Sequence, residues 1–169
     1  SNKFRYNSYN DLGLIYIIIY KDLEKANENI KEAAFSEYPF AQCNYGLFKL
    51  LYLNNLPDAE YMFKRSSEHH FSIAEYNLGR LKENEGNIEQ AIEFYKNASD
   101  HEDATIVFQG TVYFDYRLDI SKTFIICLTN LKLVEYYFAC NEYEESKEYF
   151  IKAFKKLNTS SYKFHFSFS

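Results

Sequence analysis

Histidines and acidic side chains gather in two segments of the chain that are predicted to be loops. His69 and His70 are neighbours, and His101 is followed directly by Glu102 and Asp103. Imidazole nitrogens and carboxylate oxygens are zinc ligands, so a convergent set of these five residues could bind a metal ion. Loops are polar in any case, however, and a repeated loop repeats its polar residues. We therefore favour solvated loops at both places and predict neither a metal ion nor a cofactor.

Cysteine is the other reactive residue type in the chain. Cys43, Cys127 and Cys140 each lie in an apolar, helix-like stretch, where cysteine usually acts as a small buried hydrophobe rather than as a nucleophile. The sequence also lacks a glycine-rich phosphate loop, a nucleophile elbow and an HExxH helix. We therefore predict no catalytic residue and no enzyme activity. The odd number of cysteines, without a CxxC pair, favours the reducing cytoplasm, with a secreted or lumenal location left open.

Composition and charge restrict the possible partners. The net charge of −5 argues against non-specific nucleic-acid binding, which requires a basic surface. The longest apolar run, Leu12–Tyr20, has nine residues and is too short for a membrane span. Two prolines and five glycines are too few for a turn-rich β-fold and favour long helices. The 17 tyrosines and 16 phenylalanines supply large rings for a core or for a protein interface.

The glycines reveal an internal repeat. Their spacings are 33, 33 and 31 residues in the series Gly13, Gly46, Gly79 and Gly110. Nine or ten residues after each glycine, a second pattern begins with a large aliphatic residue, at Leu23, Leu56, Ile88 and, more weakly, Ile120. Glycine inside a helix costs about 1 kcal/mol relative to alanine, so its recurrence in one frame indicates that two backbones approach closely there. The pattern predicts a helix, a tight turn and an antiparallel helix, repeated along the chain.

The repeat defines the domain organisation. We predict a single all-α domain over residues 1–157, an α-α superhelix (solenoid) of about four to five stacked hairpins. The predicted hairpins cover residues 8–37, 38–70, 71–102, 103–130 and 131–157, and Asn87 and Asp119 are predicted helix N-caps. The fourth interval is irregular, because the next repeat position after Gly110 is Val134, only 24 residues later. Residues 119–140 therefore form either one long helix or two short ones, and we favour a long or sharply broken helix.

Residues 158–169 form an aromatic tail. In this tail Tyr162, Phe164, Phe166 and Phe168 alternate with Lys, His and Ser, which is the periodicity of a strand. The tail is interpreted either as an extended terminus or as a strand-like arm that docks on a partner or on the solenoid.

Two stretches of the repeat carry a family resemblance. Residues 66–79, which read SSEHHFSIAEYNLG, resemble the junction between Sel1-like repeats, and residues 91–98, AIEFYKNA, resemble the second helix of that family. The last unit is similar to an ordinary tetratricopeptide repeat (TPR) at seven characteristic positions, namely Leu133, Val134, Tyr137, Tyr143, Ser146, Phe150 and Ala153. The resemblance covers roughly residues 8 to 157.

The resemblance implies a binding surface on the concave side, which the first helix of each hairpin lines. The implied groove residues are Cys43, Asn44, Leu47, Tyr76, Asn77, Arg80, Glu83, Val107, Thr111 and Phe114. Asn44 and Asn77 repeat in register, and they either bind the backbone of an extended peptide or make structural bonds within the repeats.

The resemblance also implies a function. Sel1-like proteins are known as scaffolds and adaptors, so we expect a non-catalytic scaffold that binds a peptide or a helix of a protein partner. The alternative is an interaction module of a larger multidomain signalling protein or enzyme whose catalytic domain is absent from this sequence. A solenoid needs polar caps, and the aromatic ends of this one raise the further possibility of self-association through the terminal hairpins.

Overall fold

The computed structural model describes the backbone of residues 2–101 and 115–159 and the side chains of residues 5–101 and 125–156. Within these ranges the chain is helical and contains no strand. The helices are α1 (Asn2–Ile15) with the π-helix η1 (Tyr16–Tyr20) at its end, α2 (Leu23–Ala34), α3 (Pro39–Leu51), α4 (Leu56–Ser67), α5 (Ser72–Asn84), α6 (Ile88–Asp100), α7 (Asp115–Ala139) and α8 (Tyr143–Thr159).

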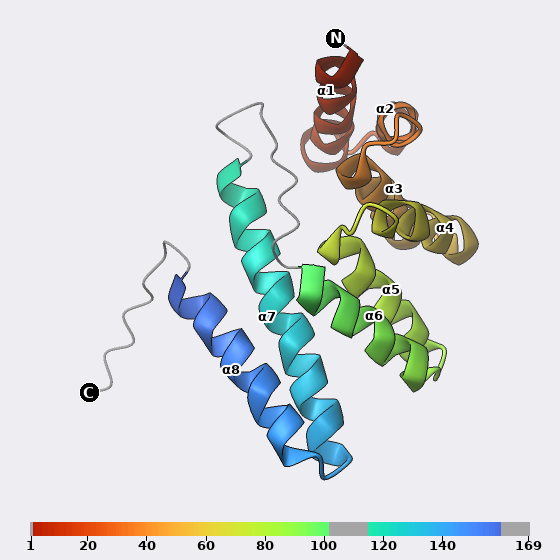
Figure 1. Ribbon diagram of the computed structural model, residues 1–169. Coiled ribbons are helices and arrows are strands. Elements are labelled where there is room, and N and C mark those ends of the chain that lie inside the picture. The colour runs from red at the N-terminus through yellow and green to blue at the C-terminus, as the bar shows by residue number, and fades with distance from the viewer. Residues whose placement is uncertain (1, 102–114, 160–169) are drawn as a thin grey trace.

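The helices pair in chain order and the pairs stack in a row. The pairs α1–α2, α3–α4, α5–α6 and α7–α8 are joined by short turns, and the second helix of each pair packs on the first helix of the next. Figure 1 shows this progression from the red and orange pair α1–α2 to the longer teal and blue pair α7–α8. The predicted all-α solenoid is confirmed.

The repeated glycines lie where the two helices of a hairpin touch. A β-carbon built on Gly46 would lie 2.7 Å from the ring of Phe63 and 3.2 Å from the carbonyl oxygen of Ala59. A β-carbon on Gly79 would lie 2.5 Å from the ring of Tyr95. Both distances to the rings are shorter than a van der Waals contact. Each glycine thus makes room for a bulky side chain of the partner helix. Gly110 lies outside the described residues.

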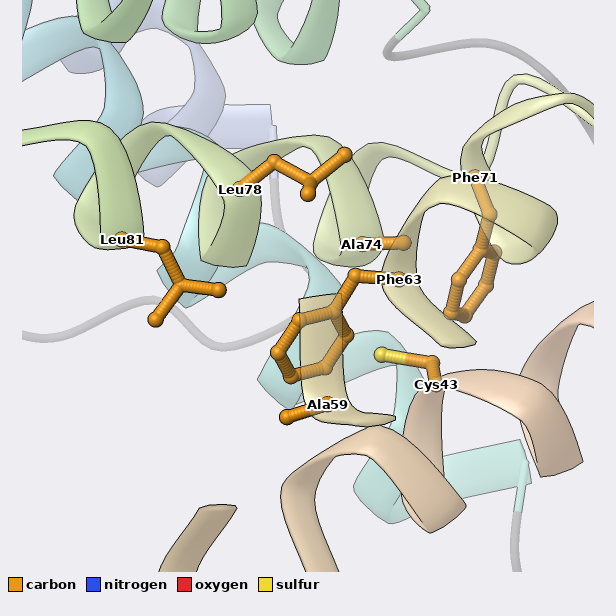
Figure 2. Packing of buried hydrophobic residues seen from close by; sticks show 7 residues of the cluster. All are labelled: Cys43, Ala59, Phe63, Phe71, Ala74, Leu78 and Leu81. Atoms are coloured by element: carbon orange, nitrogen blue, oxygen red, sulfur yellow. The ribbon is translucent and has the colours of Figure 1, made fainter. Parts of the chain in front are cut away.

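Each buried cluster joins one hairpin to the next. In Figure 2, Phe63 of α4 lies between Cys43 of α3 and Leu78 of α5. The whole cluster contains Cys43, Ala59, Phe63, Phe71, Ala74, Leu78 and Leu81. A second cluster joins α5, α6 and α7 in the same way, through Tyr76, Ala91, Ile92, Tyr95, Ala98, Leu133 and Tyr137. A single hairpin cannot bury its apolar face, and the neighbouring hairpin completes the core.

Asparagine and aspartate side chains begin the second helix of the first three hairpins. Asp22, Asn55 and Asn87 each accept a hydrogen bond from the backbone N–H three residues later. This confirms the prediction for Asn87. The prediction for Asp119 is wrong, because this residue lies inside α7. The preceding residue has a left-handed backbone in each turn, and at Gly86, with φ +79°, glycine adopts it without strain.

Helix α7 runs through the predicted boundary between the fourth and fifth hairpins. The boundary at residues 130 and 131 falls inside this 25-residue helix, so residues 115–130 share a hairpin with α8. The sequence of α7 contains neither glycine nor proline, so nothing in it breaks the helix. Of the two alternatives for residues 119–140, the long helix is therefore present. Helix α8 continues to Thr159, into the predicted tail, and the rest of the tail lies outside the described residues.

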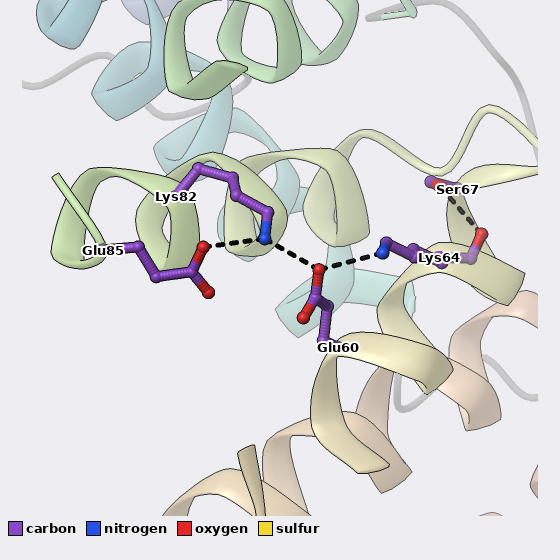
Figure 3. Close-up of polar contacts among 5 residues, drawn as sticks. All are labelled: Glu60, Lys64, Ser67, Lys82 and Glu85. Atoms are coloured by element: carbon purple, nitrogen blue, oxygen red, sulfur yellow. Dashed lines mark hydrogen bonds and ion pairs between the residues drawn. The ribbon is translucent and has the colours of Figure 1, made fainter. Parts of the chain in front are cut away.

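An ion-pair network ties α4 to α5 (Figure 3). The Lys82 Nζ atom lies 2.8 Å from carboxylate oxygens of both Glu60 and Glu85, and the Lys64 Nζ atom lies 2.9 Å from Glu60. Hydrogen bonds from Lys82 and Lys64 lower the pKa of Glu60, because they stabilise its charged form. The Lys82 side chain is largely buried while that of Lys64 is exposed. Lys82 is therefore the residue that links the two hairpins.

We expect Lys82→Met to lower the free energy of unfolding by about 1 kcal/mol at neutral pH, since it removes the charge and keeps the aliphatic stem. The ionised Glu60 side chain stabilises the folded chain fully above the carboxyl pKa of the unfolded chain, about 4.3. This stabilisation is lost as the pH falls through the lower pKa that Glu60 has in the folded chain. Urea unfolding at neutral and acidic pH measures both effects. Lys64→Met is the control, and an equal loss in this exposed variant would contradict the assignment.

Large apolar side chains are exposed at both ends of the row. Ile18, Ile19 and Tyr20 of η1 are exposed at one end, and Phe150 and Phe154 of α8 at the other. Leu51, Tyr52 and Leu53, at the end of α3 in the second hairpin, are exposed as well. None of the helices in the described ranges is long and apolar enough to span a membrane.

Candidate functional site

The structure places the predicted groove residues of α3 at different depths. Cys43 is fully buried and belongs to the cluster around Phe63, whereas Asn44 and Leu47 are half-buried. Burial raises the pKa of the Cys43 thiol to about 12. A thiol with such a pKa stays protonated near neutral pH, so Cys43 suits a core position and not a nucleophile. Cys127 is buried as well, and Cys140 is exposed at the end of α7.

The predicted residues of α5 divide in the same way. Tyr76 and Asn77 are buried, Arg80 is exposed and Glu83 is half-buried. Tyr76 belongs to the cluster between α5, α6 and α7, so its ring packs in the core. The last three predicted residues, Val107, Thr111 and Phe114, lie outside the described residues.

The two asparagines in register make hydrogen bonds between hairpins. Asn44 Nδ2 donates to Asn10 Oδ1 of α1 at 3.0 Å. Asn77 Nδ2 donates to the Ile73 carbonyl oxygen at 2.9 Å and to Cys43 Sγ of α3 at 3.9 Å. Both side chains thus connect first helices of successive hairpins. These bonds favour a structural role for both asparagines over the binding of a peptide backbone. The bonds run between repeats as well as within one, whereas the sequence predicts them within the repeats.

A hollow opens where α5, α6 and α7 converge, and we call it the α5–α7 hollow. Its volume is about 140 Å³. Pockets for drug-sized ligands measure roughly 300–1,000 Å³, so this one has room for a single side chain and not for a typical metabolite. The hollow is lined by Glu83, Ile88, Ala91, Ile92, Tyr95, Lys132, Glu135, Tyr136 and Ala139.

Glu83 is the predicted groove residue that this hollow includes. Its carboxylate accepts hydrogen bonds from Tyr95 Oη at 2.8 Å and from Lys132 Nζ at 2.7 Å. Burial disfavours the charged form of Glu83, but the bonds from Lys132 and Tyr95 outweigh it and lower the pKa of this carboxyl. Burial and the neighbouring carboxylate raise the pKa of Tyr95. The hollow therefore has a fixed negative charge on one side and an ammonium group beside it.

Sequence reasoning missed Lys132, Glu135 and Tyr136, which line the hollow from α7. These residues lie in the irregular interval, where the sequence comparison aligned only the neighbouring apolar positions Leu133, Val134 and Tyr137. The one available signal was the amphipathic spacing of Lys132 and Tyr136, which places both on one face of a helix.

The histidines of the two predicted loops meet in space. His70 and His101 have ring centroids 4.2 Å apart, and Glu75 of α5 joins them, with its Oε1 atom 2.7 Å from His101 Nδ1. His69 is exposed and is not part of this group. Glu102 and Asp103 lie outside the described residues. Sequence reasoning missed Glu75 because this residue lies on a helix and not in a loop.

Helical hairpins that are closed by a repeated glycine contact and stacked in a row define an α-solenoid of the Sel1-like and tetratricopeptide-like fold. No family model matches the chain, and no curated protein matches its sequence. Solved structures do match in fold.

A Sel1 repeat protein from Oxalobacter formigenes superposes with a TM-score of 0.63 at 18% sequence identity, over 89% of this chain and 58% of that protein. The TPR-like protein MamA superposes with a TM-score of 0.53 at 20% identity, over 89% of this chain and 77% of its own. The chain thus spans less than two thirds of the Sel1 repeat protein. At these identities the similarity establishes the fold, and it confirms the predicted Sel1-like and TPR-like architecture.

Proposed function

We propose that the chain is a non-catalytic protein–protein interaction scaffold that binds a peptide or a helix of a partner protein on its concave face. Sel1-repeat and TPR-like proteins are typically protein-interaction scaffolds, which supports this class of function. The observation that carries the proposal is the α5–α7 hollow, into which an anchoring side chain of the partner inserts.

The lining of the hollow supports an apolar anchor. Ile88, Ala91, Ile92 and Ala139 supply apolar walls, and Ile88 is 44% exposed in the free chain. An apolar side chain that covers these walls gains roughly 25 cal/mol for each Å² removed from water. Energetic hot spots at protein interfaces are typically such pockets, surrounded by polar residues that exclude water.

The charged side chains around the hollow support selectivity for a partner segment that carries complementary charges. Lys132 and Glu83 lie on its edge, and Glu135, whose side chain is highly exposed, lies 3.9 Å from Lys132. Arg80, one turn before Glu83 on α5, is exposed as well. Complementary charges on both sides of an apolar anchor orient a bound segment and discriminate against other sequences. We infer that the bound segment carries a large apolar residue flanked by charged ones.

We expect Ile88→Asp to weaken peptide binding at least about tenfold, because it places a carboxylate in the apolar wall of the hollow. A peptide is first selected from a random display library against the wild-type chain, and its affinity is then measured by fluorescence anisotropy. Tyr76 is unsuitable for this test because it is buried, so its replacement changes stability together with binding.

Leu56→Asp is the matched control. Leu56 begins α4 as Ile88 begins α6, each follows an asparagine N-cap, and Leu56 is 41% exposed. This control is expected to bind the peptide as the wild type does. Equal losses in both variants, or none in Ile88→Asp, would contradict a binding role for the hollow.

A further inference from the structure

Three potential metal ligands converge at the open end of the α5–α6 hairpin. His70 lies in the turn between α4 and α5, Glu75 lies in the first turn of α5, and His101 directly follows α6. One ligand atom from each of the three side chains lies within 4.8 Å of the other two. Glu75 follows His70 by 5 positions and precedes His101 by 26 positions, so the hairpin fold is needed to bring the three together.

Glu75 is the buried member of this group. Its exposed fraction is 3%, although it carries a carboxyl group. One oxygen, Oε1, lies 2.7 Å from His101 Nδ1, while the other, Oε2, is buried and has no hydrogen-bond partner in the described part of the chain. A buried, unpartnered carboxylate oxygen is costly unless a cation or a donor satisfies it. This oxygen is the independent indication that the group has a ligand.

The backbone holds the two histidines on either side of this carboxylate. His70 has a left-handed backbone, with φ +56°, and its N–H donates to the Ser67 carbonyl oxygen at 2.8 Å. The N–H of His101 is bonded to the Asn97 carbonyl oxygen at the end of α6. Both histidines thus begin from fixed backbone positions. The His70 side chain is exposed, with its ring 4.2 Å from that of His101, and the His101 ring is in contact with Glu75.

We propose that His70, Glu75 and His101 form a binding site for Zn²⁺. Two imidazoles and one carboxylate match the ligand types that zinc takes, whereas calcium and magnesium prefer oxygen alone. Zinc bonds of about 2.0–2.1 Å in tetrahedral geometry place ligand atoms about 3.3 Å apart, so rotation of the exposed His70 ring closes the site. Binding of the ion at His101 Nδ1 replaces the hydrogen bond to Glu75, so the imidazole ligates in its neutral form with its proton on Nε2, and a second proton, where His101 carries one, goes to solvent.

The proposed ion would join two ends of the hairpin and would keep one coordination position that no protein side chain fills. It links the turn before α5 to the end of α6 and so closes the open end of this hairpin. Three protein ligands leave the fourth tetrahedral position to water or to an external group, on the side where His70 faces solvent. The site shares no residue with the α5–α7 hollow, so the zinc proposal and the proposed function succeed or fail independently.

Zinc affinity, measured by competition with a chromophoric chelator, tests the proposal. The protein is tag-free and carries Cys140→Ser, because Cys140 is the exposed thiol of the described residues and would bind zinc itself. We expect one zinc per chain, and at least about tenfold weaker binding after His70→Ala, His101→Ala or Glu75→Gln. The absorption spectrum of bound Co²⁺ reports the tetrahedral geometry, and zinc is expected to raise the midpoint of thermal unfolding of the parent but not of these three variants.

His69→Ala is the matched control, because it removes an exposed imidazole next to His70 and outside the group. It is expected to bind zinc as the parent does. His70→Ala removes an exposed side chain and is expected to keep the fold, so a loss of zinc with an unchanged circular dichroism spectrum is not a loss of folding. The proposal is overturned if the parent binds no zinc, if His70→Ala and Glu75→Gln bind it as tightly as the parent, or if His69→Ala loses it equally.

Discussion

Phe63→Ala is expected to lower the free energy of unfolding by about 3–5 kcal/mol and the midpoint of thermal unfolding by roughly 6–20 °C. The Phe63 ring has no exposed area and lies against Gly46 of α3 in the cluster that joins α3, α4 and α5. Its removal leaves a cavity where the second and third hairpins meet. Because stacked repeats depend on their interfaces with neighbours, both hairpins lose stability. Urea unfolding followed by circular dichroism measures this loss.

Tyr61→Ala is the control for this experiment. Tyr61 also lies on α4, two residues away, but it is 55% exposed. The control is expected to change the free energy of unfolding by less than about 1 kcal/mol, as exposed positions usually do. If the two variants unfold alike, the cluster around Phe63 is not the joint between these hairpins.

Gly79→Ala is expected to destabilise the chain by about 1–3 kcal/mol, although alanine is the better helix former. The added β-carbon would lie 2.5–2.6 Å from two ring carbons of Tyr95, and these two residues are buried. The Tyr95 ring cannot move freely, because it packs on Tyr76 and its hydroxyl donates to Glu83. Overlap with this fixed ring outweighs the gain of about 1 kcal/mol from helix propensity.

A double-mutant cycle with Tyr95→Leu separates the two effects. The three atoms nearest to the added β-carbon all belong to the Tyr95 ring. Without this ring we expect the cost of Gly79→Ala to fall, and its sign to reverse if helix propensity dominates. An unchanged cost in the Tyr95→Leu background would show that the repeated glycines have a different role. The same displacement of Tyr95 would deform the α5–α7 hollow, which this ring lines.

The repeat frame was readable from the sequence because its causes are local. Gly46 and Gly79 had to be glycine where a ring of the second helix crosses the first, and they recur because the same crossing recurs. Asn87 caps α6 through its own side chain, and no distant residue is needed for that bond. The prediction that Asp119 is an N-cap was wrong, because the residue type alone does not show where a helix begins. Asparagine and aspartate favour helix starts, but α7 had already begun at Asp115.

The sequence did not show which residues of the predicted binding surface are buried. The frame places Cys43 and Tyr76 on the first helix of a hairpin, and the resemblance assigned this face to a groove. In the structure both side chains are covered by the neighbouring hairpin. Helical periodicity shows which residues share a face, but it does not show how much of that face the next repeat covers.

The sequence by itself determined the architecture, namely helical hairpins in a frame of about 33 residues, because each glycine and cap acts on its own turn or on the adjacent helix. The tertiary structure decided which side chains remain available. It placed Lys132 beside Glu83, 49 residues earlier in the chain, and it gathered His70, Glu75 and His101 at one end of a hairpin. These contacts depend on the angle at which successive hairpins stack and on the path of the chain at helix ends. Both are set by the sum of many core contacts and not by any short sequence pattern.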